Sequence, residues 1–267
     1  MTAMKILLKL SYLGTGYCGY QVQANGVTVQ EKLNEAAQAL FGHPCDIVGC
    51  SRTDSGVHAN EFCAAVSRKG ETGLQTGIPI GRLPLAFSAH LPPDISVFDA
   101  VWVNEDFHPR YDVCEKEYLY RIYNRPVRSP FEEGRSCHIP RPITDCDLAR
   151  MQEAAAYFVG THDFSAYMAS GSKITDPVRT VFGSVLERQG DVILYRVRAN
   201  GFLYHMVRIL AGTLLAVAEG RLEPDDIPAV TASRDRSRAG ITMPAEGLYL
   251  NRVVYPGHLF RTGKENR

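Results

Sequence analysis

The alternation of strand-like and helix-like segments is the feature that most restricts how this chain can fold. In residues 4–13, leucine and isoleucine alternate with Lys5 and Lys9, which is the two-residue period of a strand with one face in water. Similar segments predict further strands over residues 45–50, 61–67, 95–103, 117–123, 180–187, 192–199 and 247–254.

Helical patterns lie between these strands. Thr28 and Glu31 have the spacing of a capping box, and apolar residues then recur at helical spacing until Gly42 can end the helix. Residues 202–219, closed by Gly220, give the strongest helical pattern. Further helices are expected over residues 144–158 and, as a short one, from residues 223–225.

The order of these elements predicts the fold class. Residues 180–187 and 192–199 are expected to form a hairpin that turns at residues 189–191, and such neighbours are frequent. This favours an α+β fold with mixed or antiparallel sheets over a wholly parallel sheet. A polar segment near residues 104–110 divides the chain into an expected N-terminal half, 1–105, and a C-terminal half, 106–267.

Composition limits the environment of the protein rather than its activity. The 29 basic and 29 acidic residues cancel, so any nucleic-acid surface must be a local basic groove balanced by acid elsewhere. Seven cysteines without a Cys-x-x-Cys pair indicate reduced thiols rather than a zinc site. The longest apolar stretch, residues 209–218, is too short for a membrane span, and we expect a cytoplasmic protein.

The polar loop at residues 51–59, SRTDSGVHA, is the first candidate site. It places Arg52, Asp54, Gly56 and His58 within seven residues between two predicted strands. A connecting loop with an internal Arg–Asp bridge is the simpler explanation, but the density of functional side chains and the glycine favour a site.

The helix over residues 202–219 carries the second candidate. Arg208 interrupts an apolar run, and the expected helix places it on one stripe with Tyr204, Ala211 and Gly212. The small residues would let another backbone come close. Arg208 could extend into solvent, or it could be partly buried and require a carboxylate, for which Asp54 is the evident partner.

Aromatic and basic residues form the third candidate. The segment Phe107-His108-Pro109-Arg110-Tyr111 precedes Lys116, and Tyr118 and Tyr120 follow on one face of a predicted strand. Core packing would explain at least one of the tyrosines. The alternative is a platform on which a nucleobase stacks, with the basic residues close to phosphate.

Taken together, these motifs resemble the TruA-type family of tRNA pseudouridine synthases. The similarity extends over YLGTGYCGYQVQ, SRTDSGVHA, FHPRYDVCEKEYLYRIYN, GTHDFSAY, DPVRTV, GFLYHMVRILAGTL and PAEGLYL, in the order of the family. The chain has Tyr20 where the family commonly has Trp, and Ser51 where it commonly has Gly. Neither departure removes a catalytic group, and both bear on the geometry of the loops.

The resemblance implies two RRM-like α+β halves whose sheets meet at a central active-site cleft, and a homodimer that holds tRNA across both subunits. It also implies isomerisation of uridine to pseudouridine in the anticodon stem-loop, at about positions 38 to 40 of the tRNA, by base flipping. No cofactor and no metal are expected.

The same resemblance assigns roles to individual residues. It makes Asp54 the catalytic aspartate, Arg208 its paired arginine and Tyr118 the tyrosine that stacks on uracil. Arg52 and Arg110 match residues that handle RNA. We expect further substrate contacts in a basic cleft, from the remaining candidates Phe107, His108, Lys116, Arg125 and Lys173.

The chemistry requires a carboxylate near C1′ and a pocket that retains the freed uracil. Asp54 could attack C1′, add to the uracil ring or remove a ribose proton, and the residues do not distinguish these. Two alternatives from other classes are an RNA chaperone without catalysis and an aspartate-dependent hydrolase of a small glycoside. An RNA chaperone would leave the combination of Asp54, Tyr118 and Arg208 unexplained. A glycoside hydrolase would need a second acid, which the motif lacks.

Overall fold

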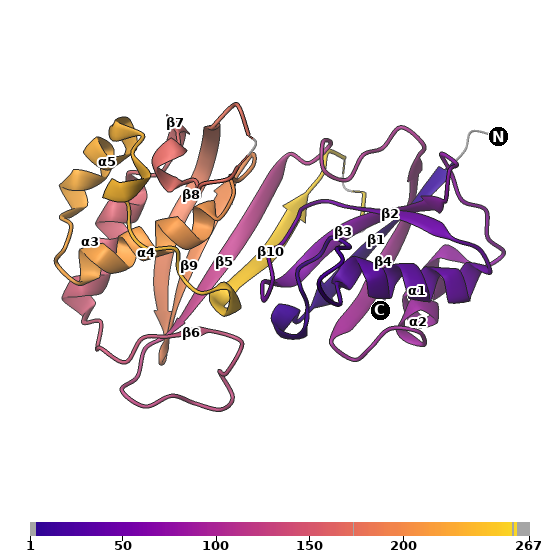
Figure 1. Cartoon of the computed structure of the whole chain (residues 1–267), viewed down its shortest axis with the longest axis horizontal. Helices are drawn as coiled ribbons and strands as arrows, with labels where there is room; N and C mark the ends of the chain where they lie inside the picture. Colours follow the sequence, from indigo (N-terminus) through magenta and orange to yellow (C-terminus); the bar gives the residue numbers. More distant parts are fainter. Residues whose placement is uncertain (1–3, 173, 258, 261–267) are drawn as a thin grey trace. The chain divides into compact units, whose positions relative to one another are not determined.

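The computed structural model describes residues 4–172, 174–257 and 259–260 (Figure 1). Within these ranges, no helix has the length and hydrophobicity that crossing a membrane requires. The chain separates into two compact units. The first comprises the described residues up to Cys114 and those from Leu250 onwards, and the second comprises Glu115–Tyr249.

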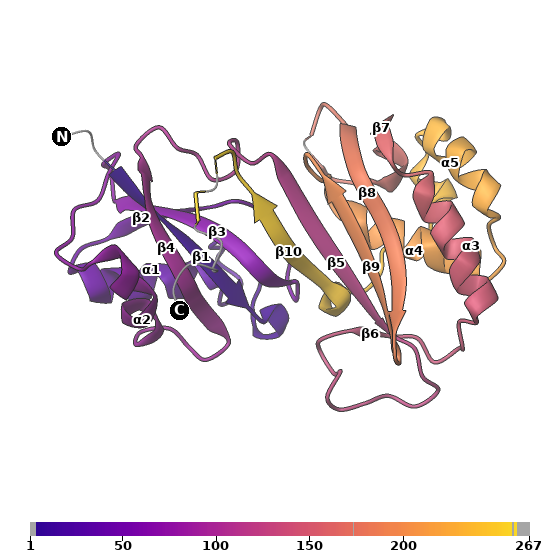
Figure 2. The same cartoon turned by 180° about the vertical axis from the view of Figure 1, so that it is seen from behind.

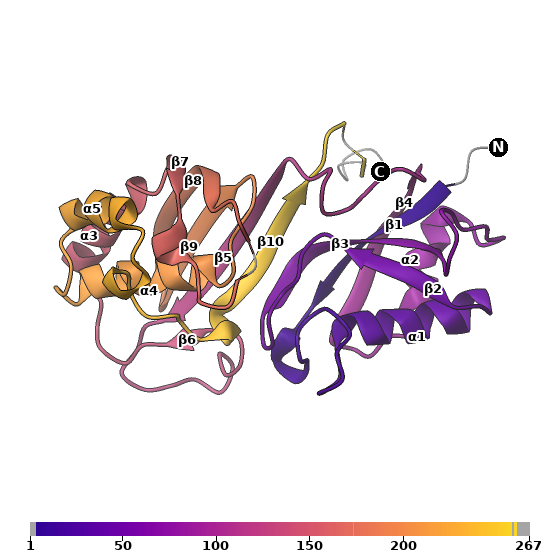
Figure 3. The ribbon, with the colours of Figure 1, turned by 45° about the horizontal axis from the view of Figure 1, so that its top comes forward.

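The first unit is a sheet with two helices. Its elements are β1 (Met4–Tyr12), the 3-10 turn η1 (Gly14–Gly16), α1 (Val29–Phe41), β2 (Cys45–Gly49), β3 (His58–Arg68), η2 (Ile80–Arg82), α2 (Leu83–Ser88), β4 (Ile95–Asn104) and the greater part of β10 (Leu248–Val254). The strand order is β4-β1-β3, and both β2 and β10 pair with β3. Figure 3 shows α1 and α2 beside each other along this sheet.

The helix α1 forms as its sequence predicts. The Thr28 hydroxyl accepts the N–H of Glu31 at 3.2 Å, and the Glu31 carboxylate accepts the N–H of Thr28 at 3.2 Å. At the other end Gly42 takes the left-handed conformation with φ of 74° and closes the helix. The short helix α2 was not predicted, because Pro84 suggested irregular structure. The proline lies in the first turn, where no backbone donor is needed.

The second unit is also an α+β structure. Its elements are β5 (Glu115–Tyr123), β6 (Cys137–His138), α3 (Asp145–Ala156), β7 (Gly160–Asp163), η3 (Ser165–Tyr167), β8 (Val178–Gln189), β9 (Val192–Ala199), α4 (Met206–Ala218), η4 (Pro224–Asp226), α5 (Ile227–Ser233), η5 (Arg236–Arg238), η6 (Ala245–Gly247) and the start of β10. The strand order is β5-β9-β8-β7, antiparallel throughout, and β6 runs parallel to β5. Figure 2 shows β8 and β9 in front of α4.

The two units repeat one order of elements. In the first it is β1-α1-β2-β3-α2-β4, and in the second it is β5-α3-β8-β9-α4 followed by β10, with the short strands β6 and β7 as additions. This βαββαβ order is the split βαβ arrangement. The predicted α+β class is therefore confirmed, whereas the cleft between the halves stays a proposal. The sequence-based division at residues 105 and 106 also stays a prediction, and the observed units differ from it in where strand β10 belongs.

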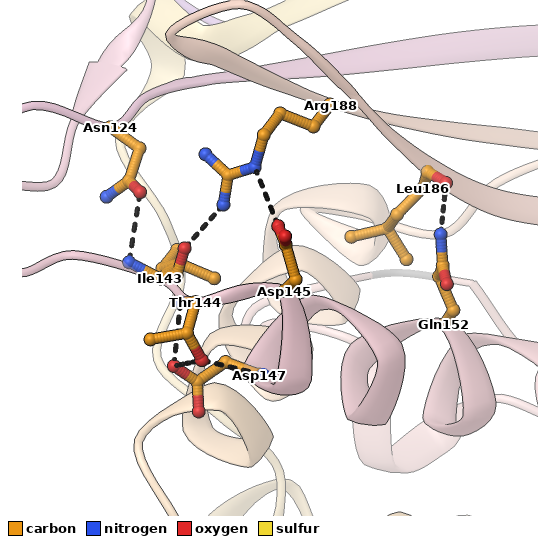
Figure 4. Close-up of polar contacts among 8 residues, drawn as sticks. All are labelled: Asn124, Ile143, Thr144, Asp145, Asp147, Gln152, Leu186 and Arg188. Carbon is orange, nitrogen blue, oxygen red and sulfur yellow. Dashed lines mark hydrogen bonds and ion pairs between the residues drawn. The ribbon is translucent and has the colours of Figure 1, made fainter.

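Polar contacts fix the start of α3 against the sheet (Figure 4). The Asn124 side chain accepts the N–H of Ile143 at 3.0 Å, and Arg188 donates to the carbonyl of Ile143. Thr144 and Asp147 form a capping box at the helix start. Because Asn124, which directly follows β5, and Arg188 on β8 both hold Ile143, the helix has one position on its sheet.

Candidate active site

The loop that carries Asp54 joins β2 to β3 in the first unit. Asp54 is half-buried and Arg52 is exposed. The N–H of Val57 donates to the carbonyl of Asp54 at 3.1 Å, which closes a turn around Ser55 and Gly56. Gly56 has φ of 80°, a conformation that a glycine adopts without strain. The glycine in the motif therefore has a backbone role.

Thr53, directly before the aspartate, is held by two neighbouring segments. Its hydroxyl lies 2.8 Å from the Tyr12 hydroxyl in a buried hydrogen bond. Its carbonyl accepts the N–H of Tyr20 at 3.1 Å. These contacts come from β1 and from the segment that follows η1, so the conformation of the loop is fixed by residues that are distant in the sequence. Sequence reasoning missed Tyr12 as a supporting residue, because nothing in its own segment marks it.

His58 fastens the other end of the loop. Its side chain is fully buried, and its Nδ1 accepts the N–H of Gly14 at 2.9 Å. Nδ1 is therefore unprotonated, and a neutral ring carries its proton on Nε2. The N–H of Gly56 also donates to the carbonyl of Tyr17 at 3.3 Å. The motif histidine thus joins η1 to the start of β3, a positional role that its place in the sequence did not reveal.

Glycines allow η1 and the Asp54 loop to approach closely. A Cβ on Gly14 would lie 2.0 Å from the carbonyl oxygen of Val57, and a Cβ on Gly19 would lie 2.6 Å from that of Thr53. Contacts below 3.0 Å essentially never occur for real Cβ atoms. The glycines of the YLGTGYCGYQ motif are therefore the signal in the sequence for a segment that packs against the Asp54 loop.

Tyr20 fills the space beneath this loop. Its ring stacks on Phe62 with centroids 4.3 Å apart, and only 2% of its surface is exposed. Burial raises the pKa of the Tyr20 hydroxyl and Cys50 adds to the rise, while the positive charge of Arg110 opposes it. Arg110 is therefore close to the supports of the Asp54 loop. Tyr20 therefore packs as a buried aromatic residue at the position where the family commonly has Trp.

The segment from Phe107 to Asp112 lies in the same unit. The Phe107 ring contacts Tyr255 with centroids 5.2 Å apart, and the Tyr255 hydroxyl donates to the carbonyl of Pro109 at 2.6 Å. Phe107 thus has a packing contact, and its expected contact with RNA stays a prediction. His108 and Arg110 are both half-buried on this segment.

The second unit carries Tyr118 and Arg208. Tyr118 and Tyr120 lie on one face of β5, opposite Val197 and Tyr195, as predicted. Both are buried, and the Tyr118 ring meets Phe202 edge-on with centroids 4.9 Å apart. Tyr118 therefore has a defined ring position before any substrate binds.

Arg208 and Tyr120 hold one backbone segment between them. The Nε of Arg208 donates to the carbonyl of Met243 at 2.6 Å, and the Tyr120 hydroxyl donates to the carbonyl of Pro244 at 2.7 Å. Burial is the largest cause that raises the pKa of Tyr120, and the charge of Arg208 opposes the rise. Arg208 is half-buried, as the second alternative expects, and its carboxylate partner stays a prediction.

The helix that carries Arg208 differs from the prediction at its start. α4 begins at Met206, because His205 has φ of 58° and interrupts the helical backbone. Tyr204 therefore lies outside the helix, against His205 with ring centroids 3.9 Å apart, and the predicted stripe that included it is wrong. The prediction of a close backbone neighbour is confirmed, since a Cβ on Gly212 would lie 2.0 Å from the carbonyl oxygen of Ile241.

Two of the remaining basic candidates, Lys116 and Arg125, belong to the second unit. Lys116 lies on β5 opposite Ala199 and is half-buried. Arg125 is exposed and its Nε lies 3.3 Å from an Asp191 carboxylate oxygen. Lys173 lies outside the described residues. Asp54 and Arg52 belong to the first unit, whereas Tyr118 and Arg208 belong to the second. The approach of Arg208 to Asp54 stays a prediction.

Comparisons with known proteins bear on this site. The sequence model of a family described as tRNA pseudouridine synthase matches residues 154–256. Proteins named tRNA pseudouridine synthase A are 41% identical in Thermoanaerobacter pseudethanolicus over 250 residues and 42% identical in Ruminiclostridium cellulolyticum over 252 residues, each alignment covering 94% of this chain and 99% of the relative. The one from Bacillus pumilus is 41% identical over 259 residues with the same coverage. Since identity of this degree extends through both units, with the Asp54 loop in the first and Tyr118 and Arg208 in the second, the chain belongs to the tRNA pseudouridine synthase A family.

Proposed function

We propose that this chain converts uridine to pseudouridine in the anticodon stem-loop of tRNA, with Asp54 as the catalytic carboxylate. The observation that carries the proposal is the immobilised Asp54 loop, in a chain 41% identical to proteins named tRNA pseudouridine synthase A. The loop is held at Thr53 and at His58 by buried hydrogen bonds of 2.8 and 2.9 Å. A half-buried carboxylate on a fixed loop is suited to act at one atom of a bound substrate.

The reaction is an isomerisation, and its atoms balance without any other reactant. The bond between N1 of uracil and C1′ of ribose breaks, and a bond between C5 and C1′ forms. The proton at C5 is released and N1 gains one. The carboxylate must be ionised to act as nucleophile or base, and a neighbouring cation favours that form. We assign this role to Arg208.

Tyr118 is proposed to stack on the uracil after it leaves the helix of the RNA. Flipping a base costs on the order of a few kcal/mol, which stacking and hydrogen bonds in the pocket offset. The edge contact with Phe202 supports this assignment, because it fixes the orientation of the ring on which the base would stack. Tyr120, which is engaged with Pro244, has the structural role that we expected for one of the two tyrosines.

Isomerisation can be tested with tRNA that carries tritium at C5 of uridine. The wild-type chain should release tritium to water with no free base. Binding without release would indicate an RNA chaperone, and free uracil would indicate a hydrolase, so either result contradicts the proposal. Asp54→Asn should abolish release and keep tRNA affinity nearly unchanged. Asp106→Asn is the matched control, because Asp106 is another aspartate of the same unit and lies outside the Asp54 loop.

The assembly and location of the enzyme are further parts of the proposal. Membership of the family supports a homodimer that holds tRNA across both subunits in the cytoplasm, with no cofactor. Sedimentation of the purified chain with and without tRNA tests the dimer. A monomer that turns over tRNA at a rate independent of protein concentration would contradict it.

A further inference from the structure

Tyr111 combines high exposure with a fixed ring. Its side chain is 75% exposed, although a tyrosine ring has considerable apolar surface. The ring lies over the His108 imidazole with centroids 4.2 Å apart and an interplanar angle of 25°. One face of the tyrosine therefore rests on another ring.

The His108 ring is itself immobilised by its own turn. Its Nδ1 accepts the N–H of Arg110 at 3.2 Å and the N–H of Tyr111 at 3.3 Å. The N–H of His108 donates to the Asp112 carboxylate at 2.9 Å. Burial lowers the pKa of His108 below its usual value and the charge of Arg110 lowers it further, which favours the neutral ring at pH 7, with Nδ1 as the acceptor.

The turn is anchored to the core of the first unit. The Lys5 ammonium donates to the carbonyl of Phe107 at 3.2 Å, and the Tyr255 hydroxyl donates to the carbonyl of Pro109 at 2.6 Å. Tyr255 also lies close to Cys50. Burial is the largest cause that raises the pKa of Tyr255, and Cys50 raises it further. Cys50 directly precedes the loop of Asp54, so Tyr255 lies close both to the turn and to the start of that loop.

The surroundings of Tyr111 select a type of partner. His108, Arg110 and Asp112 are polar or charged, so the exposed ring is not part of an apolar patch for a protein surface. Arg110 and Lys5 both contribute positive charge at His108. A flat ring beside cations suits a nucleobase that carries phosphates. Because a rotamer already held by His108 has little conformational freedom to lose, binding on this ring costs little entropy.

We propose that Tyr111, supported by His108, is a stacking platform for an unpaired base of the RNA substrate other than the target uridine. The inference rests on the proposed function for the identity of the RNA. It adds a second aromatic contact with the RNA, besides the one proposed for Tyr118, and this contact lies in the unit that carries Asp54. Tyr111 acts on substrate position and has no part in the bond-breaking steps.

Affinity for unmodified tRNA, measured for a set of Tyr111 variants, tests the platform. Tyr111→Phe and Tyr111→Trp should bind like the wild type, because both keep a flat ring. Tyr111→Leu should bind about 5- to 150-fold more weakly, the loss expected for one base–aromatic stack. Binding is read without turnover, so the outcome does not depend on whether the chain isomerises uridine.

The dependence of affinity on salt separates stacking from charge. Arg110→Ala should lower the log–log slope by roughly 0.7 to 0.9 for each phosphate that the variant no longer binds, whereas Tyr111→Leu should leave the slope unchanged. Phe131→Leu, at a residue 85% exposed in the other unit, is the control for loss of surface hydrophobicity and should bind like the wild type. Thermal unfolding of each variant identifies those that are folded.

Three results would overturn the proposal. The first is equal affinity of the folded Leu and Phe variants, which means that the ring does not stack. The second is a reduced salt slope in Tyr111→Leu. The third is a change in sedimentation of Tyr111→Leu that accounts for its weaker binding, which would show that the ring contacts a second copy of the chain.

Discussion

Gly14→Ala should strongly lower kcat, because the added methyl group displaces the Asp54 loop. The added Cβ would lie 2.0 Å from the carbonyl oxygen of Val57 and 2.6 Å from its carbonyl carbon. Real Cβ contacts are rarely shorter than 3.0 Å, so the two backbones must separate by at least 3.0 − 2.0 = 1.0 Å. The hydrogen bond from the Gly14 N–H to His58, now 2.9 Å long, would stretch with them.

A displacement of this size has a predictable effect on catalysis. Misplacing a catalytic group by about 1 Å lowers the rate by roughly 100-fold, and we expect that loss in kcat for tritium release at saturating tRNA. Overpacking of a buried contact should also lower the free energy of unfolding by about 1 to 3 kcal/mol, measured by urea denaturation. Affinity for tRNA should change much less than kcat.

Gly16→Ala provides the control within the same turn. A Cβ on Gly16 would meet nothing within 4 Å, so this variant should keep the activity and stability of the wild type. The reasoning is refuted if folded Gly14→Ala has a kcat close to that of Gly16→Ala. It is also refuted if the loss in Gly14→Ala lies wholly in KM, because the substrate-binding residues would then have moved instead of the aspartate.

Other predictions concern single side chains. Tyr118→Phe should keep tRNA affinity and Tyr118→Leu should lose about 5- to 150-fold in affinity, and equal binding by both would show that Tyr118 does not stack. The Tyr20 hydroxyl is buried without a hydrogen-bond partner among the described residues, so Tyr20→Phe should raise the free energy of unfolding by about 1 kcal/mol in urea denaturation, and a decrease would show that the hydroxyl is satisfied. Folding lowers the pKa of His108 from 6.5, so the unfolded chain binds a proton at a higher pH than the folded chain does. The stability that is present above pH 6.5 should therefore decline as the pH falls towards the folded pKa. Denaturation between about pH 5 and 8 should show a weaker decline in His108→Asn, and identical profiles would contradict the shift.

The elements of the fold could be predicted where their signals are local. The capping box at Thr28 and Glu31 involves neighbours in sequence, and α1 begins and ends where they indicate. The start of α4 could not be predicted, because the positive φ of His205 depends on contacts beyond its own segment. The four-residue strand β7 was missed because it is too short to show a period.

The candidate site could be predicted only as a motif. The loop at Asp54 is recognisable from its own residues, but its supports come from Tyr12 and Gly14, 41 and 44 positions away from their partners. Such pairs depend on the register between β1 and β3, which no single segment contains. Tyr111 belongs to the third candidate in the sequence, but its exposure could not be predicted, because Phe107 and His108 give the same aromatic signal although Phe107 packs on Tyr255 and His108 supports the Tyr111 ring.

Strand β10 has a consequence for the order in which the chain can fold. The second unit is an insertion, because the polypeptide leaves the first unit at Cys114 and returns to it at Leu250. During synthesis the edge of β3 thus stays unpaired until the whole insertion has left the ribosome. Only then can β10 pair with it and form the Asn60–Asn251 hydrogen bond of 2.7 Å. An unpaired edge is a site of mispairing with other chains, so rapid folding of the insertion protects the nascent half that carries the aspartate.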